Sequence, residues 1–157
     1  MVTLLLTILQ DAFWSGLAAM GFAILFNVPR NLLPTCALFG ALGHAVRTLL
    51  VSFGLSIEPA TLAAAAFVGF LGTYWAQRLA VPAPIFTVTG AIPMVPGVFA
   101  YRAMIGVLSV ISVDPTNNSE MLLGATSYGI KTGLILAAIA IGIAFPTLVF
   151  QRPKPVV

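Results

Sequence analysis

Long apolar stretches separated by short polar breaks dominate the pattern of this chain. A helix that crosses a bilayer core of about 30 Å needs roughly 20 apolar residues. Stretches that meet this requirement lie at about 4–26, 35–53, 60–80, 84–111 and 120–150. The segments between them carry Pro, Gly and Asn, which end helices. The pattern therefore predicts an all-α membrane protein, with a bundle of about five transmembrane helices in a single transmembrane domain over residues 1–157.

Composition also indicates a lipid-facing surface. Hydrophobic residues make up 60% of the chain and charged residues 7%, whereas about a quarter of a soluble domain is charged. The basic residues form no run, so the net charge of +3 does not indicate nucleic-acid binding. The one cysteine, Cys36, excludes an internal disulfide and is read as a small packing residue. We expect no cofactor and no metal ion.

Charged residues between the spans predict an orientation. With five spans, one side of the membrane has four basic residues and no acidic residue, and the other side has three acidic residues and no basic residue. The basic set is Arg30, Arg78, Arg152 and Lys154, and the acidic set is Glu58, Asp114 and Glu120. Since Lys and Arg concentrate in cytoplasmic loops, we expect the C-terminus in the cytoplasm and the N-terminus outside.

Three of the predicted spans present small residues at helical spacing, which lets helices approach closely in lipid. The three sets are Cys36, Gly40, Gly43 and His44; Ala65, Gly69 and Thr73; and Gly129, Gly133 and Ala137. We expect these faces to pack against each other or against a partner.

Five ionisable residues fall inside the predicted spans, where a charge is costly. They are Asp11, His44, Arg47, Arg102 and Lys131. Pairing with the single acid can neutralise one of the cations, and the remaining positive charge predicts a site for an anion or a carboxylate-bearing solute. Two alternatives stay open. In the first, Asp11, Arg102 and Lys131 extend to the lipid headgroups. In the second, His44 and Arg47, which share a helix face, pair structurally with Asp11. His44, as the one histidine, can also couple transport to protons.

The fourth stretch contains a P-x-x-P-G motif at Pro93, Pro96 and Gly97. A proline lacks an N–H and clashes with the carbonyl four residues earlier, so Pro93 frees the carbonyl of Thr89 and Pro96 that of Ile92. We therefore expect a break in mid-membrane, which is tolerated inside protein or beside a water-filled cavity.

The break predicts a binding site. Pro96 suits the first turn of a new half-helix, where the N–H groups of Gly97 and Val98 would be free to hold a substrate carboxylate. The freed carbonyls, including that of Thr89, would be acceptors. A simple proline kink is the alternative reading.

Several motifs resemble the threonine/serine exporter family, and in particular its short, stand-alone half. They are F-N-V-P at 26–29, G-A-L-G-H at 40–44 with Arg47, F-T-V at 86–88, I-P-M-V-P-G at 92–97, and Ala100-Tyr101. The resemblance implies export of small amino acids such as threonine and serine, or of small carboxylates such as succinate, across the bacterial inner membrane. The N-terminus would then be periplasmic. It also implies a second membrane subunit of about five spans, or a homo-oligomer.

The resemblance carries functional roles to Pro93, Pro96, Gly97, His44 and Arg47, whereas roles for Arg102 and Lys131 rest on the charge argument alone. Two other functions remain in view. The chain can be an accessory or assembly subunit whose partner holds the transport site. A membrane-embedded enzyme is disfavoured, because one histidine without paired acids offers few acid–base arrangements.

Overall fold

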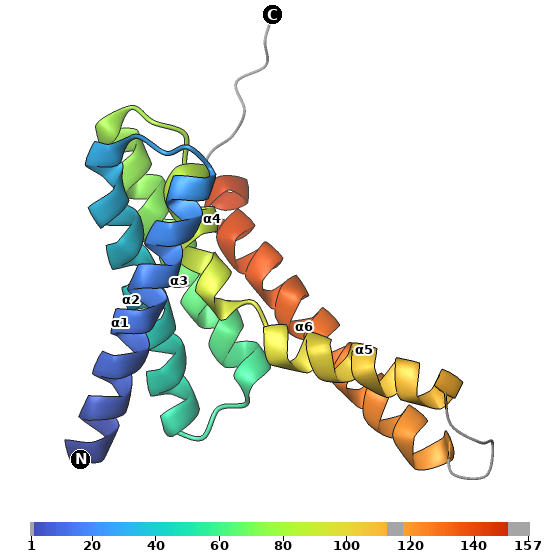
Figure 1. Cartoon of the computed structure of the whole chain (residues 1–157). Coiled ribbons are helices and arrows are strands. Elements are labelled where there is room, and N and C mark those ends of the chain that lie inside the picture. The colour runs from blue at the N-terminus through green and yellow to red at the C-terminus, as the bar shows by residue number, and fades with distance from the viewer. Residues whose placement is uncertain (1, 113–117, 151–157) are drawn as a thin grey trace, which may run out of the picture. The chain divides into compact units, whose positions relative to one another are not determined.

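The computed structural model describes residues 2–112 and 118–150, and within these ranges it is helical without strands (Figure 1). The α-helices are α1 (Val2–Leu25), α2 (Leu33–Ser52), α3 (Ile57–Leu79), α4 (Pro84–Ala91), α5 (Gly97–Ser112) and α6 (Asn118–Phe150). Two 3₁₀ helices, η1 (Arg30–Leu32) and η2 (Ile92–Met94), precede α2 and follow α4. The prediction of an all-α membrane fold is confirmed.

Four described helices are long and apolar enough to cross a membrane: α1, η1 together with α2, α3, and Met121–Val149 of α6. The α4–η2 segment and α5 form a bent pair. If the pair is one broken span, it is the fifth span; otherwise it is a re-entrant loop. The prediction of about five spans therefore agrees with the helices. The single-domain organisation and the membrane orientation stay predictions. Arg152, Lys154 and Asp114, on which the orientation partly depends, lie outside the described residues.

The chain divides into two compact units. The first contains α1 to η2 together with α6 from Ala138 onward, and the second runs from Val95 to Ala137 and contains α5 and the first part of α6.

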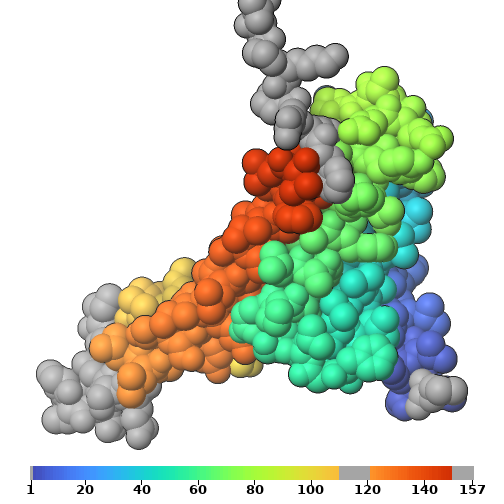
Figure 2. Space-filling model, turned by 180° about the vertical axis from the view of Figure 1, so that it is seen from behind, coloured from blue at the N-terminus to red at the C-terminus, as the bar shows by residue number. Residues whose placement is uncertain are grey.

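Small residues bring the helices of the first unit close together. A Cβ built at Gly40 of α2 would lie against the Ala19 side chain and 2.9 Å from the Ser15 carbonyl oxygen of α1. One built at Gly69 of α3 would lie 2.9 Å from the Gly142 carbonyl oxygen of α6. Figure 2 shows the green surface of α3 directly beside the last part of α6. The close packing predicted for the faces of α2 and α3 is therefore present.

Aromatic and sulfur side chains fill the core of the first unit. The rings of Phe39 and Phe86 have centroids 5.6 Å apart, and both side chains are buried. Cys36 is fully buried, and its thiol donates to the Ile85 carbonyl oxygen at 3.4 Å. Its predicted role as a small packing residue fits this environment.

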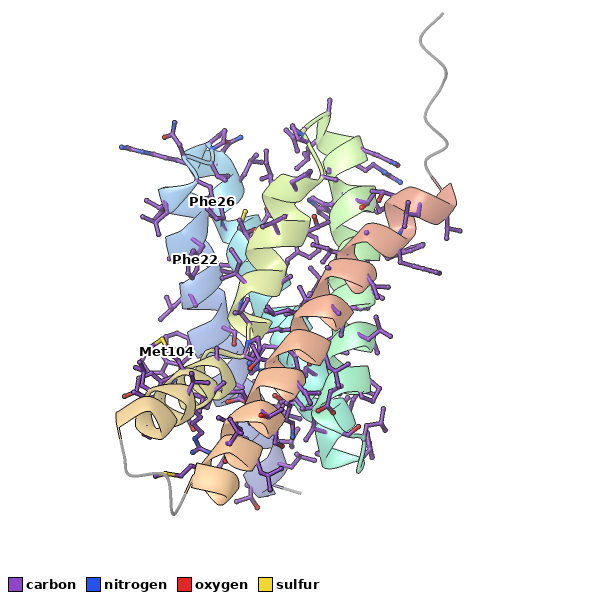
Figure 3. All side chains as sticks on the ribbon, turned by 90° about the vertical axis from the view of Figure 1, so that its right-hand side faces the viewer. Phe22, Phe26 and Met104 are labelled. Carbon is purple, nitrogen blue, oxygen red and sulfur yellow. The ribbon has the colours of Figure 1, made fainter. Side chains whose placement is uncertain are left out.

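The second unit packs through Gly106 of α5, where a built Cβ would lie 2.7 Å from the Ala125 Cβ of α6. The predicted Gly129/Gly133 face differs, because among the described residues no atom outside the surrounding turns of α6 lies within 4 Å of a Cβ built at either glycine. Many large apolar side chains are also exposed, among them Phe22, Phe26 and Met104 (Figure 3). Such a surface is typical of a protein that faces lipid or a membrane partner.

The predicted break is confirmed, and proline chemistry explains its place. Helix α4 ends at Ala91, η2 contains Pro93, and α5 begins at Gly97 directly after Pro96. Since neither proline can donate an N–H, the helical ladder cannot continue through them. The Ala100 N–H donates to the Pro96 carbonyl oxygen at 3.0 Å and starts the new helix. The Gly97 N–H, which was predicted to be free, instead donates to the Val95 carbonyl oxygen at 2.9 Å.

Candidate functional site

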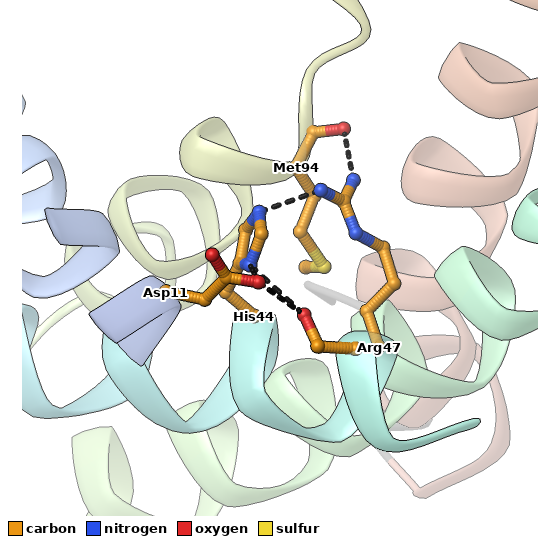
Figure 4. A network of polar contacts seen from close by, with 5 residues as sticks. Asp11, His44, Arg47 and Met94 are labelled. Carbon is orange, nitrogen blue, oxygen red and sulfur yellow. Dashed lines mark hydrogen bonds and ion pairs between the residues drawn. The ribbon is translucent and has the colours of Figure 1, made fainter. Parts of the chain in front are cut away.

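A continuous chain of polar contacts joins α1 and α2 to the helix break (Figure 4). Asp11 comes from α1, and His44, Arg47 and Thr48 come from α2. Positions 44, 47 and 48 are three and four residues apart, so one face of α2 carries all three side chains. The sequence predictions Asp11, His44 and Arg47 are thereby brought together in space.

Arg47 connects α2 to the break. Its Nη1 donates to the Met94 carbonyl oxygen at 2.9 Å, and its Nη2 lies 2.5 Å from His44 Nε2. Met94 is the last residue of η2 and is fully buried. The carbonyl that receives the arginine is therefore that of Met94, and not one of the two predicted acceptors, Thr89 and Ile92.

These contacts determine which nitrogen of His44 carries the proton. A guanidinium has N–H donors and no acceptor, so His44 Nε2 must accept from Arg47. In a neutral imidazole the proton then sits on Nδ1, which lies 3.5 Å from the Thr48 hydroxyl oxygen and 4.0 Å from Asp11 Oδ2. The two ring nitrogens thus face two different partners, the cation on one side and the carboxylate on the other.

Asp11 is held by Thr48. The Thr48 hydroxyl donates to Asp11 Oδ2 at 2.9 Å across the α1–α2 interface. The side chain of Asp11 is 38% exposed and that of His44 is 16% exposed. Asp11 therefore contacts α2 through the Thr48 hydroxyl and lies 4.0 Å from His44 Nδ1, while a structural pairing of this acid with His44 and Arg47 stays a prediction.

Arg47 consequently keeps a positive charge without a carboxylate in contact. Among the described residues its two hydrogen bonds go to a backbone carbonyl and to an imidazole nitrogen, both of which are neutral acceptors. A guanidinium carries five N–H donors and binds carboxylates in a bidentate fork. The arrangement can therefore bind a carboxylate from a solute next to the helix break.

Two other predicted residues of the break, Thr89 and Pro93, contact their surroundings within the first unit. Thr89 is buried, and its hydroxyl donates to the Ile85 carbonyl oxygen of its own helix at 2.6 Å. Pro93 faces α2, where its Cγ lies 3.6 Å from a Cβ built at Gly40. That distance would be an ordinary van der Waals contact, so it is α1, and not the break, that requires glycine at position 40.

Arg102 and Lys131 belong to the second unit, where both stand over aromatic rings. The Arg102 guanidinium lies 5.5 Å from the Tyr128 ring centroid, and its Nη1 lies 3.4 Å from the Tyr128 hydroxyl. Lys131 Nζ lies 5.1 Å from the Phe99 ring centroid, and the Phe99 and Tyr128 rings stack at 6.2 Å. Cation–π contacts of this kind stabilise a positive charge in apolar surroundings. Tyr101, also predicted, is exposed on α5.

Sequence reasoning missed Thr48 and the Met94 carbonyl. A threonine in an apolar helix commonly bonds to the carbonyl one turn earlier in its own helix, as Thr89 does, so the residue type gives no signal. The position of Thr48, four residues after His44, was the available clue. Within the part of the chain that the structure describes, no group of three or more His, Cys, Asp or Glu could hold a metal ion.

Comparison with known proteins places this geometry in a family. No solved structure matches the chain. The model of the threonine/serine exporter family matches residues 11–149, a range that includes the whole network from Asp11 to Met94 as well as the helix break. This match agrees with the multi-pass helical fold and with a role in solute transport. The chain therefore belongs to the threonine/serine exporter family.

Proposed function

We propose that this chain is a subunit of an exporter that moves small amino acids such as threonine and serine, or small carboxylates of the succinate type, out of the cytoplasm. Membership of the exporter family supports solute export. The finer proposal, that the solute carboxylate is held near the broken helix, rests on Arg47, which is directed at the break and bonded to neutral acceptors.

A solute carboxylate would compete with the Met94 carbonyl for Arg47. A carboxylate carries a full negative charge and can accept two parallel N–H bonds from a guanidinium, so it is a better acceptor than a neutral carbonyl. Its arrival would release the contact between α2 and η2 that Arg47 makes now. Substrate binding would in this way be linked to the packing of the break against α2, and discontinuous helices of this kind form the substrate sites of other transporter folds.

We further propose that the chain works in the bacterial inner membrane with its N-terminus in the periplasm, together with a second membrane subunit of about five spans or with copies of itself. Transporters that alternate access commonly contain two repeats, whereas the described residues of this chain contain four to five candidate spans. The bare Gly129/Gly133 face and the exposed apolar side chains would suit such a partner.

An accessory role is the second candidate. The same contacts, from Thr48 to Asp11 and from Arg47 to Met94, fasten α1, α2 and η2 together. A network with that purpose would stabilise the subunit while the partner carried the transport site.

Solute efflux tests the two candidates. Inner-membrane vesicles are loaded with labelled threonine, serine or succinate, and efflux is followed for this chain alone, for its five-span partner alone, and for both. Each preparation containing this chain is repeated with Arg47→Gln. Arg78→Gln is the matched control, because Arg78 is exposed and contacts Tyr74 of its own helix, 5.0 Å from the ring centroid.

The exporter proposal expects efflux that requires this chain and falls strongly with Arg47→Gln but not with Arg78→Gln. Full efflux by the partner alone would instead establish the accessory role. Efflux that needs this chain but is indifferent to Arg47 would remove the carboxylate site from the proposal.

A further inference from the structure

The charges of Asp11 and Arg47 lie in one network and yet are not in contact. In apolar surroundings, opposite charges attract far more strongly than in water, and a carboxylate is the preferred partner of a guanidinium. Asp11 instead receives the Thr48 hydroxyl at 2.9 Å, while Arg47 donates to His44 and Met94. Something in the arrangement must therefore keep the acid from the cation.

The His44 ring provides part of the separation. Asp11 Oδ2 lies 4.0 Å from His44 Nδ1, whereas Arg47 lies against Nε2 on the other side of the same ring (Figure 4). The ring alone cannot fix the carboxylate, because the Asp11 side chain is 38% exposed and a 4.0 Å ion-pair distance exceeds hydrogen-bonding range. The short contact that holds Asp11 in place is the one from Thr48.

Thr48 is well placed for this task. It follows Arg47 directly in α2 and stands one turn after His44, so its hydroxyl faces the acid and the ring together. A hydroxyl donates one hydrogen bond and accepts others. By donating to Asp11 at 2.9 Å it holds the carboxylate, and its oxygen lies 3.5 Å from Nδ1 of His44, the ring nitrogen that does not contact Arg47.

We propose that Thr48 is a positioning residue of the exporter, which holds the Asp11 carboxylate away from Arg47 and so keeps the guanidinium available for a solute carboxylate. This inference rests on the proposed function of Arg47. Without the Thr48 hydroxyl, Asp11 moves toward Arg47 as an internal competitor, and the apparent affinity for the solute falls. Because the competitor is the negative charge of Asp11, the Thr48 hydroxyl is no longer needed for solute affinity once that charge is removed.

A double-mutant cycle tests this dependence. Thr48→Val, which replaces the hydroxyl by a methyl group at nearly constant volume, is made in the native chain and in the Asp11→Asn chain. Apparent KM and maximal rate of efflux are measured in vesicles, together with membrane abundance and thermal unfolding of each variant. Thr48→Ser keeps the hydroxyl. Thr7→Val is the matched control, because the Thr7 hydroxyl donates to the Thr3 carbonyl of its own helix.

We expect Thr48→Val to raise the apparent KM by about tenfold or more in the native chain, the size of a lost hydrogen bond to a charged group. In the Asp11→Asn chain the same substitution should change KM less than about twofold, since coupled sites are non-additive. Thr48→Ser and Thr7→Val should stay near the native KM.

Two results would overturn the inference. If Thr48→Val has the same effect in both backgrounds, or none in either, Thr48 does not act through Asp11. If Arg47→Gln exports with native KM, the proposed function fails and this inference fails with it. If Arg47→Gln impairs export while Thr48→Val has the same effect in the native and the Asp11→Asn chain, only the positioning role of Thr48 fails, and the proposed function of Arg47 stands.

Discussion

The two units of this protein treat positive charge in apolar helices differently. In the first unit, Arg47 is bonded to a backbone carbonyl at a helix break and to a histidine. In the second unit, Arg102 and Lys131 stand over the rings of Tyr128 and Phe99. Aromatic faces stabilise a cation through the negative charge of the ring face, and the Tyr128 hydroxyl lies 3.4 Å from Arg102 Nη1 as well. The comparison teaches that the surroundings of an intramembrane cation differ between the units, so that charge by itself does not define a site, and the proposal of a solute site rests on the polar groups and the broken backbone around Arg47.

The largest expected difference between the units concerns export. Arg47→Gln should lower efflux about a hundredfold, because the proposed solute carboxylate would lose its charged partner, and loss of one partner from a hydrogen-bonded charge pair costs roughly 2–5 kcal/mol. Arg102→Gln should lower it less than about threefold, because a cation–π contact at an accessible site is worth roughly 0.5–1 kcal/mol. Initial efflux rates at equal membrane abundance measure both. Equal losses at the two positions would erase the distinction between the units.

The next largest difference between the units is expected for the effect of glycine-to-alanine substitutions on stability. Gly40→Ala should destabilise the protein by about 1–3 kcal/mol, the usual cost of overpacking, because the new Cβ meets Ala19 and the Ser15 carbonyl. Gly129→Ala should be neutral or stabilise by up to about 1 kcal/mol through helix propensity, since its Cβ would enter open space among the described residues. Thermal unfolding in detergent reports both values.

The same pair of variants also tests for a partner. If Gly129→Ala leaves the unfolding of the isolated chain unchanged and yet reduces export or assembly, the bare glycine face is an interface. Unfolding at lower temperature in Gly129→Ala, equal to that in Gly40→Ala, would contradict the open surroundings of Gly129.

The smallest expected effect lies in the aromatic cluster. Tyr128→Leu removes the ring under Arg102 and the stack with Phe99, and should destabilise the second unit by about 0.5–2 kcal/mol. Tyr128→Phe keeps the ring and should have less than half of that effect. Protease sensitivity near α5, compared with that of α3, measures the change within one sample. Identical behaviour of the two variants would mean that the ring contributes no cation–π stabilisation.

Much of the fold could be predicted because its causes are local. Apolar length defines a span. Pro93 and Pro96 lie within one turn of each other and together interrupt the helical ladder, whereas the single Pro146 lies inside α6. The F-N-V-P turn is a similar case. Asn27 adopts φ of 56°, a left-handed conformation that asparagine tolerates better than most residues. Cys36 was also read correctly as a packing residue, since a small side chain amid apolar neighbours has few other roles.

The candidate site was predicted in its charged members and missed in its connections. The sequence places Asp11, His44 and Arg47 within apolar helices, and helical spacing puts the last two on one face. It does not say that Gly129 and Gly133 remain bare or that Gly97 bonds back to Val95. Those outcomes depend on which helices lie next to each other.

The sequence by itself determined the membrane class, the helices, the break and the identity of the costly charges, because hydrophobic length, proline and glycine act through near neighbours. Only the tertiary structure decided that the Thr48 hydroxyl donates to Asp11 and that Arg47 donates to the Met94 carbonyl oxygen. It also decided that Arg102 lies over the Tyr128 ring and Lys131 over the Phe99 ring. The physical reason is that a hydrogen bond or a cation–π contact requires a distance of a few ångströms between different helices. The close approach of α1 and α2 at Gly40 sets that distance for Thr48 and Asp11, and residue type does not.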